Sequence, residues 1–449
     1  MLKKSFYNII VDELENGDVL LYNSLTNAFG IMYKEIKQIY ESSEIIDENS
    51  LNDEVKKYIK MMKDNGFLVD FNLNEYEKLK ILSRISRFNQ NFLNLTIAPT
   101  LYCNMDCPYC YEKKSNSRMN EDVRNKLVDF VAGIIKKNRY KGITVTWYGG
   151  EPLLEKDIIL DLSTNFINIC KENNAEYYAG IITNGVLLNK DIAKDLREIC
   201  HVRFTQITID GLEETNNKRR RLKNGFNSFN IICNNIDECV DILDINIRVN
   251  IDKENQHDLP ALIDYFNNRW GTKVRYNFAP VDKSTDYCNY ELSKCFNNDE
   301  ITQLNSELVN LMYEKGIKNF VQNYMPRIKF VPCSAVCTNS YVICPEGNIY
   351  TCWDVIGIEE YKIGSLKDGI SINSEYLKWL SLEIPESCSE CKLLPLCQAG
   401  CPYFRIRNSN KTKCYFGSLN IKDNLKIIYK TYKESTKGCE KYENVKISM

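Results

Sequence analysis

An α/β fold built around a partial (β/α)6 barrel of the TIM type is the fold class that this sequence predicts, on three observations. Strand-like runs occur in order along the chain at 94–100, 144–150, 177–184, 203–211, 246–252 and 274–281. Helical patterns lie between most of them, which is typical of βαβ units in a parallel sheet. Six such units are too few to close a barrel of eight, so we expect an open, partial barrel.

In front of the barrel, residues 1–71 predict a small separate unit. It begins with an alternating segment that turns at Asn16-Gly17, a strong hairpin signal. Helical patterns follow, the second of which ends at Gly66 as a C-cap glycine should, and a short strand closes the unit. Residues 72–92 predict a polar helical linker to the barrel.

The rest of the chain divides where the sequence pattern changes. We expect the barrel to span 93–310 and a bridging region to span 311–332. Residues 333–420 are rich in cysteine, with short turns and little periodicity, so they need cross-links or bound metal to hold a shape. A helical, Lys-rich tail is predicted at 421–449.

Composition and charge exclude several classes of protein. Apolar residues make up 44% of the chain and charged residues 26%, which is ordinary for a globular protein. The net charge of −2 gives no electrostatic argument for nucleic acid or for an anionic membrane. No apolar run approaches the roughly 18 residues of a membrane span, and the first residues do not read as a signal peptide. We therefore expect a cytoplasmic protein.

Cysteine and histidine usage points to metal chemistry. The chain has 19 cysteines and only two histidines, so a His-based triad or a His-rich zinc site is disfavoured. A chain of this length can bury a core without disulfides, and in a reducing compartment thiols act as metal ligands or as buried bystanders.

One cysteine cluster follows the first predicted barrel strand directly. Cys103, Cys107 and Cys110 have the spacing C-x3-C-x2-C. Iron–sulfur clusters normally take four thiolates, so three thiolates on one loop leave one iron open, as a catalytic site requires. A zinc loop or a chance spacing is the alternative that the residues alone leave open.

This loop resembles the cluster-binding signature of radical S-adenosylmethionine (SAM) enzymes. Tyr109 matches an aromatic that this family places near the adenine. The second predicted strand ends in a motif that resembles the family's site for the methionyl amino group, formed by Gly149, Gly150, Glu151 and Pro152. Glycines allow close backbone approach and a carboxylate suits an ammonium, although a GGEP sequence alone would ordinarily be a turn.

Two further positions match the family. Thr208 begins a segment that resembles S-x-D-G and is expected near the ribose, and Arg220 stands where relatives carry an arginine for the methionyl carboxylate. The family's His-Asp pair before that arginine is replaced here by Asn216-Asn217. Without the family, the basic run at 218–221 would be read as a solvated charge run. The Thr183-Asn184-Gly185 turn either borders the cavity or is a simple strand exit.

The second cysteine field is similar to the auxiliary-cluster (SPASM) domain of many radical SAM enzymes that modify peptides. By position, the resemblance assigns a first auxiliary cluster to Cys337, Cys352 and Cys401, with Cys333 as the expected fourth ligand. It assigns a second cluster to Cys388, Cys391, Cys397 and Cys414. Cys344 or a substrate thiol is the alternative fourth ligand of the first cluster, and two structural zinc sites are the alternative for the whole field.

The resemblance implies three [4Fe–4S] clusters, SAM as cofactor, and reductive cleavage of SAM to a 5′-deoxyadenosyl radical that abstracts a substrate hydrogen. Residues 1–71 resemble the winged-helix leader-recognition domain fused to maturases of ribosomally made peptides, which could bind a precursor by strand addition. We therefore expect a precursor peptide with a leader, an electron donor such as flavodoxin or ferredoxin, and an intramolecular thioether (sactipeptide or ranthipeptide type) or carbon–carbon crosslink.

Two alternatives are weighed against this reading. An anaerobic sulfatase-maturating enzyme, which makes formylglycine, carries an aspartate directly after the cysteine that corresponds to Cys352, whereas this chain has Trp353 there and Asp354 next. A non-catalytic, peptide-binding iron–sulfur protein would cleave no SAM.

Overall fold

The computed structural model describes residues 1–89, 91–282, 285, 287–317, 324–414 and 420–435. Within these ranges, no helix combines the length and the apolar character that crossing a membrane requires. The chain divides into two compact units: the first holds residues 1–86, 297–332 and 383–449, and the second holds residues 87–296 and 333–382. The predicted Cys-rich domain therefore contributes residues to both units.

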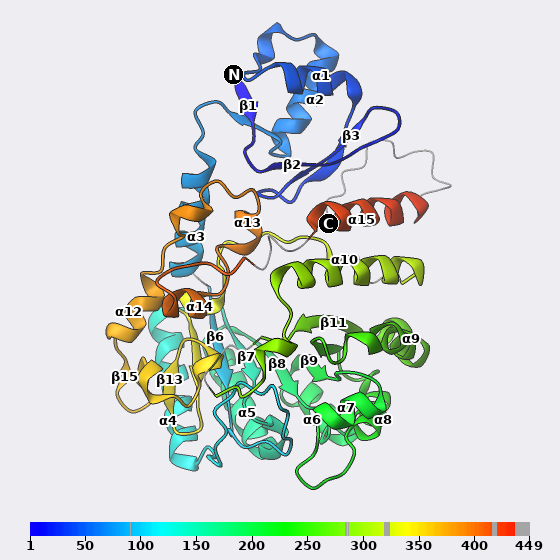
Figure 1. Cartoon of the computed structure of the whole chain (residues 1–449). Coiled ribbons are helices and arrows are strands. Elements are labelled where there is room, and N and C mark those ends of the chain that lie inside the picture. The colour runs from blue at the N-terminus through cyan, green and yellow to red at the C-terminus, as the bar shows by residue number, and fades with distance from the viewer. Residues whose placement is uncertain (90, 283–284, 286, 318–323, 415–419, 436–449) are drawn as a thin grey trace. The chain divides into compact units, whose positions relative to one another are not determined.

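The second unit is an open barrel of six parallel strands, as predicted (Figure 1). The strands are β6 (Phe92–Ile97), β7 (Gly142–Trp147), β8 (Glu176–Thr183), β9 (Val202–Thr208), β10 (Ile245–Ile251) and β11 (Arg275–Pro280). The helices of this part are α4 (Glu121–Asn138), α5 (Lys156–Glu172), α6 (Lys190–Glu198), α7 (Glu213–Arg219), α8 (Phe229–Cys239) and α9 (Leu259–Trp270). Each strand pairs in parallel with the next one along the chain, so the carboxyl ends of all six meet at one edge.

The sheet continues beyond the barrel into a part that we did not predict. Strand β12 (Ser340–Ile343) pairs in parallel with β6, and β13 (Asn348–Tyr350), β14 (Gly364–Ser365) and β15 (Gly369–Ile370) extend the sheet in antiparallel pairs. Helix α12 (Ser374–Leu380) follows. Short 3-10 helices in this unit are η2 (Pro152–Glu155), η3 (Gln256–Asp258), η4 (Gly271–Lys273), η5 (Leu292–Lys294), η6 (Ser334–Val336), η7 (Trp353–Val355) and η8 (Glu359–Tyr361).

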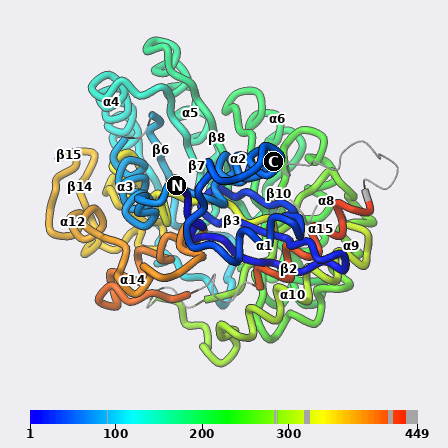
Figure 2. Tube along the Cα trace, turned by 90° about the horizontal axis from the view of Figure 1, so that it is seen from above, coloured from blue at the N-terminus to red at the C-terminus, as the bar shows by residue number. Residues whose placement is uncertain are grey.

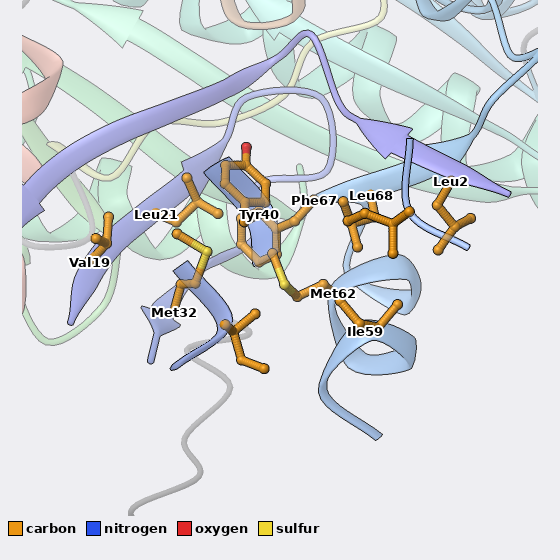
Figure 3. Packing of buried hydrophobic residues seen from close by; sticks show 11 residues of the cluster. Leu2, Val19, Leu21, Met32, Tyr40, Ile59, Met62, Phe67 and Leu68 are labelled. Carbon is orange, nitrogen blue, oxygen red and sulfur yellow. The ribbon is translucent and has the colours of Figure 1, made fainter. Parts of the chain in front are cut away.

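The first unit opens with the predicted hairpin, β2 (Asn8–Glu13) and β3 (Val19–Asn23), with Gly17 at a φ of +87° in the turn. Strand β4 (Phe29–Met32) completes this sheet, and β1 (Leu2–Lys4), which we did not predict, pairs with the expected closing strand β5 (Leu68–Asp70). The helices are η1 (Glu48–Ser50), α1 (Lys34–Ser42), α2 (Asp53–Asp64) and the linker helix α3 (Glu75–Phe88). Leu21, Met32, Tyr40 and Ile59 pack together in the core between them (Figure 3).

The other elements of the first unit are α10 (Asn298–Glu314), η9 (Glu386–Cys388), α13 (Leu394–Cys397), α14 (Pro402–Arg407) and α15 (Ile421–Ser435). Helix α15 is the described part of the predicted helical tail, and residues 436–449 lie outside the described residues. Figure 2 shows α15 beside β2, where Leu425 and Ile428 pack against Ile9 and Val11. The N-terminal strands thus share an apolar core with the C-terminal part of the chain.

Candidate active site

The loop that carries the first three cysteines packs against the turn after β7. Gly150 N donates to Thr100 O (3.2 Å), and Glu151 N donates to Tyr102 O (3.0 Å). A Cβ on Gly150 would lie 2.2 Å from Tyr102 O, and Gly149 has a φ of +107°. Glycine is required at both positions because the two backbone segments approach this closely.

The three thiols of this loop influence one another. Cys103, Cys107 and Cys110 are all partly exposed. Burial raises the pKa of Cys103 and of Cys110 to about 12, and the charge of Cys107 adds to both shifts. Thiols in such surroundings become thiolates when a metal supplies the compensating positive charge, so the donor set fits an iron–sulfur cluster.

Glu151 joins the ends of β7 and β8. Its side chain is fully buried, and its carboxylate accepts hydrogen bonds from Thr183 Oγ1 (2.7 Å), Asn184 N (2.7 Å) and Leu153 N (3.0 Å). Asn184 Nδ2 in turn lies 3.9 Å from Cys103 Sγ. Thr183 and Asn184 therefore border the site, which is one of the two readings that the sequence left open, and Pro152 begins η2 behind it. A role of Glu151 toward an ammonium group stays a prediction.

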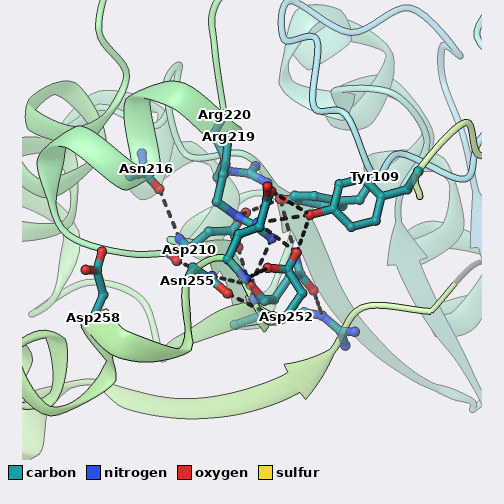
Figure 4. Close-up of polar contacts among 12 residues, drawn as sticks. Tyr109, Asp210, Asn216, Arg219, Arg220, Asp252, Asn255 and Asp258 are labelled. Atoms are coloured by element: carbon teal, nitrogen blue, oxygen red, sulfur yellow. Dashed lines mark hydrogen bonds and ion pairs between the residues drawn. The ribbon is translucent and has the colours of Figure 1, made fainter. Parts of the chain in front are cut away.

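Tyr109 is held by a buried polar network, shown in Figure 4. Its hydroxyl donates to Asp210 and accepts a hydrogen bond from Arg220 Nη1 (2.9 Å). Arg219 lies over the Tyr109 ring at 5.1 Å and donates to Asp252 (2.7 Å). The network fixes the position of the aromatic residue between Cys107 and Cys110.

The guanidinium groups of Arg219 and Arg220 differ in their ion pairs. Arg219 is paired with Asp252 and lies 3.8 Å from Asp210. Arg220 is 6% exposed, and no described carboxylate lies in an ion pair with it. Its Nε, like that of Arg219, is buried and has no hydrogen-bond partner within the described ranges. A buried guanidinium with a free donor fits an anionic ligand such as a carboxylate, whereas Arg221 on its other side is exposed.

The Asn216-Asn217 pair has a structural role in this chain. Asn216 Oδ1 accepts a hydrogen bond from Asp210 N (3.0 Å), and its Nδ2 donates to Ser228 Oγ (3.1 Å). Asn217 Oδ1 accepts from Phe229 N (2.9 Å). The departure from the family's His-Asp pair thus keeps the turn after β9 in place, where Thr208 is the last strand residue and is buried.

Comparison with known proteins agrees with this arrangement. Residues 97–266 match the radical SAM superfamily. These residues begin at the end of β6 and end within α9, so they hold the cysteine loop, the GGEP turn and the arginines. The chain contains a radical SAM domain. It is an enzyme, and the non-catalytic alternative is set aside.

Relatives in sequence include a cysteine-type anaerobic sulfatase-maturating enzyme of Clostridium novyi, 25% identical over 335 residues, which are 69% of this chain and 87% of that protein. An Fe-coproporphyrin III synthase of Methanosarcina barkeri is 25% identical over 222 residues, 48% of this chain and 51% of that protein.

Solved structures with the same fold include anSMEcpe with bound AdoMet and the Cp18Cys peptide, with a TM-score of 0.58 at 18% identity. That similarity covers 77% of this chain and 99% of that one. Streptococcus suis SuiB bound to the precursor peptide SuiA has a TM-score of 0.53 at 17% identity, covering 91% of this chain and 97% of that one.

Next to the cysteine loop lies a group of side chains that sequence reasoning missed. The hydroxyls of Tyr111 and Tyr148 are hydrogen-bonded, and Trp353 stacks on Tyr148 with ring centroids 5.4 Å apart. Burial raises the pKa of Glu112 to about 7, with Asp354 among the charges that add to the rise. Glu112 could have been predicted from the sequence, because it follows the last cysteine of the loop by two positions. Tyr148 could not, because its partners Tyr111 and Trp353 are distant in sequence.

The cysteines predicted for the first auxiliary cluster lie around the start and end of the β12–β13 hairpin. Cys333 is exposed, while Cys337 and Cys352 are buried. Burial raises the pKa of Cys337 to about 11, and the charge of Cys333 adds to the shift. Cys344 is also buried, but after burial the next cause of its raised pKa is Glu346. This favours Cys333 over Cys344 as the neighbour of Cys337, and the assignment of Cys401, in the other unit, stays a prediction.

The cysteines predicted for the second auxiliary cluster influence one another within the first unit. Burial raises the pKa of Cys397 to about 11, and Cys391, Cys388 and Cys414 all add to that shift. No three described Cys, His, Asp or Glu side chains lie close enough to share a single metal ion. A cluster with one iron per thiolate needs neighbours that are further apart. The described cysteines without an expected ligand role are buried, namely Cys170, Cys200, Cys233, Cys239, Cys288, Cys295 and Cys344.

Proposed function

We propose that this enzyme is a radical SAM peptide maturase that installs an intramolecular thioether or carbon–carbon crosslink in a ribosomally made precursor peptide. The observation that supports the proposal most is that the two structural neighbours cover different shares of this chain. The sulfatase-maturase structure is matched over 99% of its own length yet covers only 77% of this chain, whereas SuiB, crystallised with a precursor peptide, covers 91%. This chain thus has a substantial part that only the second neighbour resembles.

A bound [4Fe–4S] cluster with SAM would supply a hydrogen-abstracting 5′-deoxyadenosyl radical at the loop after β6. The chain's own residues would hold the pair: three thiols for the cluster, Arg220 for the methionyl carboxylate, and Thr208 for the ribose. The glycine turn of 149–150 keeps the loop pressed against the strand ends. Net loss of two hydrogens from the peptide would send one as an atom to the adenosyl group and the other as a proton and an electron.

The electron released in that step needs an acceptor, which we assign to auxiliary clusters. Cys388, Cys391, Cys397 and Cys414 would bind one of them, and Cys333, Cys337, Cys352 and Cys401 the other. A flavodoxin or ferredoxin would supply the electron that starts each turnover, and the protein would work in the cytoplasm, where such donors and reduced thiols are found.

Precursor recognition is assigned to a groove of about 980 Å³ in the first unit, bordered by the edge strand β2. Phe6 and Ile10, which line it, are 40% and 46% exposed. Its four ammonium groups belong to Lys3, Lys4, Lys392 and Lys422. Among the described residues none of these lysines forms an ion pair. Glu41 and Glu75 also line the groove, but its lysines outnumber these two carboxylates. The groove therefore suits a peptide segment with acidic and apolar side chains, bound beside an exposed strand.

The test is anaerobic incubation of the reconstituted enzyme with SAM, a reductant and the candidate peptides encoded beside its gene. We expect a peptide that loses two hydrogens and an equal amount of 5′-deoxyadenosine. The matched variant Lys3→Glu/Lys422→Glu should weaken peptide binding at low salt while it leaves SAM cleavage without peptide unchanged. If no candidate peptide changes mass while 5′-deoxyadenosine accumulates, the proposal is wrong.

A sulfatase-maturase type of reaction is the second candidate, and one observation favours it. Although Trp353 occupies the position after Cys352, the charge of Asp354 still contributes to the raised pKa of Tyr111, Glu112 and Tyr148. The displaced aspartate therefore reaches the same group of side chains that borders the cysteine loop. Formation of an aldehyde from a Cys-containing sulfatase peptide, and its loss in Asp354→Asn, would place this reaction first.

A further inference from the structure

Tyr7, which directly precedes β2, is a buried side chain with no role in the proposed reaction so far. Its backbone is fixed on both sides, because Tyr7 N donates to Ser5 Oγ (3.2 Å) and Tyr7 O accepts from Ser24 N (3.1 Å). The side chain is 0% exposed. The ring therefore has one well-defined position in the first unit.

The hydroxyl of Tyr7 has no hydrogen-bond partner in the part of the chain that the structure describes. A buried hydroxyl without a hydrogen-bond partner costs folding free energy. Native proteins rarely keep one unless a bound water, ion or cofactor accepts the hydrogen bond. Tyr22, equally buried in the neighbouring core, shows the usual arrangement, since its hydroxyl donates to Asn27 Oδ1 (2.8 Å).

The neighbours of Tyr7 indicate which bound group that is. Tyr7 packs in one cluster with Cys388, Leu394 and Ala399, and Cys391 lies against the same cluster. The unpartnered hydroxyl of Tyr7 thus belongs to the same packed cluster as two thiols assigned to the second auxiliary cluster. A phenol hydroxyl can donate a hydrogen bond to such a group.

We propose that the Tyr7 hydroxyl donates a hydrogen bond to a sulfur of the iron–sulfur cluster bound by Cys388, Cys391, Cys397 and Cys414, and so positions that cluster and raises its reduction potential. The inference rests on the proposed function, specifically on that auxiliary cluster. Hydrogen bonds to cluster sulfurs stabilise the reduced, more negative state, which raises the potential. The N-terminal unit would thereby tune the electron acceptor, since Ser5, Phe6 and Asn8 around Tyr7 line the peptide groove.

The test is an EPR-monitored redox titration of the full chain in a background of Cys103→Ala, Cys107→Ala and Cys110→Ala. The signal of the second auxiliary cluster is the one that Cys388→Ala removes. Tyr7→Phe should shift this signal to a lower potential with the iron content unchanged, whereas the matched Tyr22→Phe should leave it in place. An unshifted potential in a fully loaded Tyr7→Phe protein would overturn the proposal.

A second measurement needs no variant at Tyr7. Electron–nuclear double resonance on the reduced cluster should detect a proton coupling that disappears in deuterated water, and its absence would also overturn the proposal. The iron content separates failure of this inference from failure of the proposed function. If none of the iron in the Cys103/Cys107/Cys110 variant depends on Cys388, the assignment of the second auxiliary cluster is wrong, and so is this inference. If that iron is present but Tyr7→Phe does not shift the potential, only this inference is wrong and the maturase proposal stands.

Discussion

The loop around Cys103 and the segment around Cys388 both gather thiols, but the protein holds them in different ways. The loop is fixed by backbone bonds to a glycine turn, by buried Glu151, and by the network of Tyr109, Asp210 and two arginines. The segment from η9 to α14 has helices of only three, four and six residues, held by apolar packing against the N-terminal strands. We therefore predict that the fold alone orders the first thiol site, whereas the order of the second depends on the proposed auxiliary cluster.

The largest effect is expected where the fold alone orders the site. Replacing Cys103, Cys107 and Cys110 together by alanine should abolish 5′-deoxyadenosine formation, because no cluster remains to bind SAM. The midpoint of thermal unfolding should stay close to that of the parent, which calorimetry measures. A large drop in that midpoint would mean that this loop also depends on its metal.

For the Cys-rich segment we expect the reverse: loss of its thiols should mainly reduce local stability. Cys388→Ser with Cys391→Ser should make residues 383–414 about tenfold more sensitive to limited proteolysis, which corresponds to a local opening easier by about 1.4 kcal/mol. The barrel should keep its resistance. Equal protection of the segment with and without iron would contradict the comparison.

The two adjacent arginines give the next effect. Arg220→Gln should weaken SAM binding about 10- to 100-fold, since it removes a hydrogen bond to a charged group worth about 1.5–3 kcal/mol. Arg219→Gln should instead destabilise the protein by about 3–5 kcal/mol because it leaves Asp252 and Asp210 buried without their counter-charge. Isothermal titration and denaturant unfolding separate the two outcomes, and exchanged results would reverse the assignment.

The last comparison pairs the glycine turn with a helical glycine, whose replacement should give the smallest effect of all. Gly150→Ala should cost about 1–3 kcal/mol, because its Cβ would meet Tyr102 O at 2.2 Å. Gly133→Ala, in an exposed stretch of α4 with nothing within 4 Å of the new Cβ, should stabilise the helix by about 0.5–1 kcal/mol. Urea unfolding of both variants provides the measurement, and an unchanged stability for Gly150→Ala would show that the loop can move away.

Local pattern predicted most of the barrel, because its strands and helices are long and periodic. The prediction of 144–150 as a strand ran past the end of β7 at Trp147, since Gly149 turns out of the extended conformation. Strands β1 and β12 were missed because each has three or four residues and is defined by pairing with a distant strand.

The candidate site was predictable only where a motif is contiguous. The three cysteines and the glycine turn were evident from spacing, and both lie at the carboxyl ends of strands as expected. The assignment of Arg220 to the methionyl carboxylate stays a prediction from the resemblance. The pairing of its neighbour Arg219 with Asp252, 33 residues away along the chain, is found only from the fold. The grouping of Tyr148 with Trp353 and Asp354 has the same origin, because it joins the barrel to residues far along the sequence.

The pairing of β12 with β6 has a consequence for electron flow. Cys337 precedes β12 and Cys352 follows β13, so both stand on the same continuous sheet whose strand β6 leads into the Cys103 loop. Hydrogen bonds between the paired strands hold these points in a fixed register. Electron tunnelling falls steeply with distance, and a rigid connection of this kind would keep the rate between two cofactors constant while a bulky, flexible substrate enters and leaves.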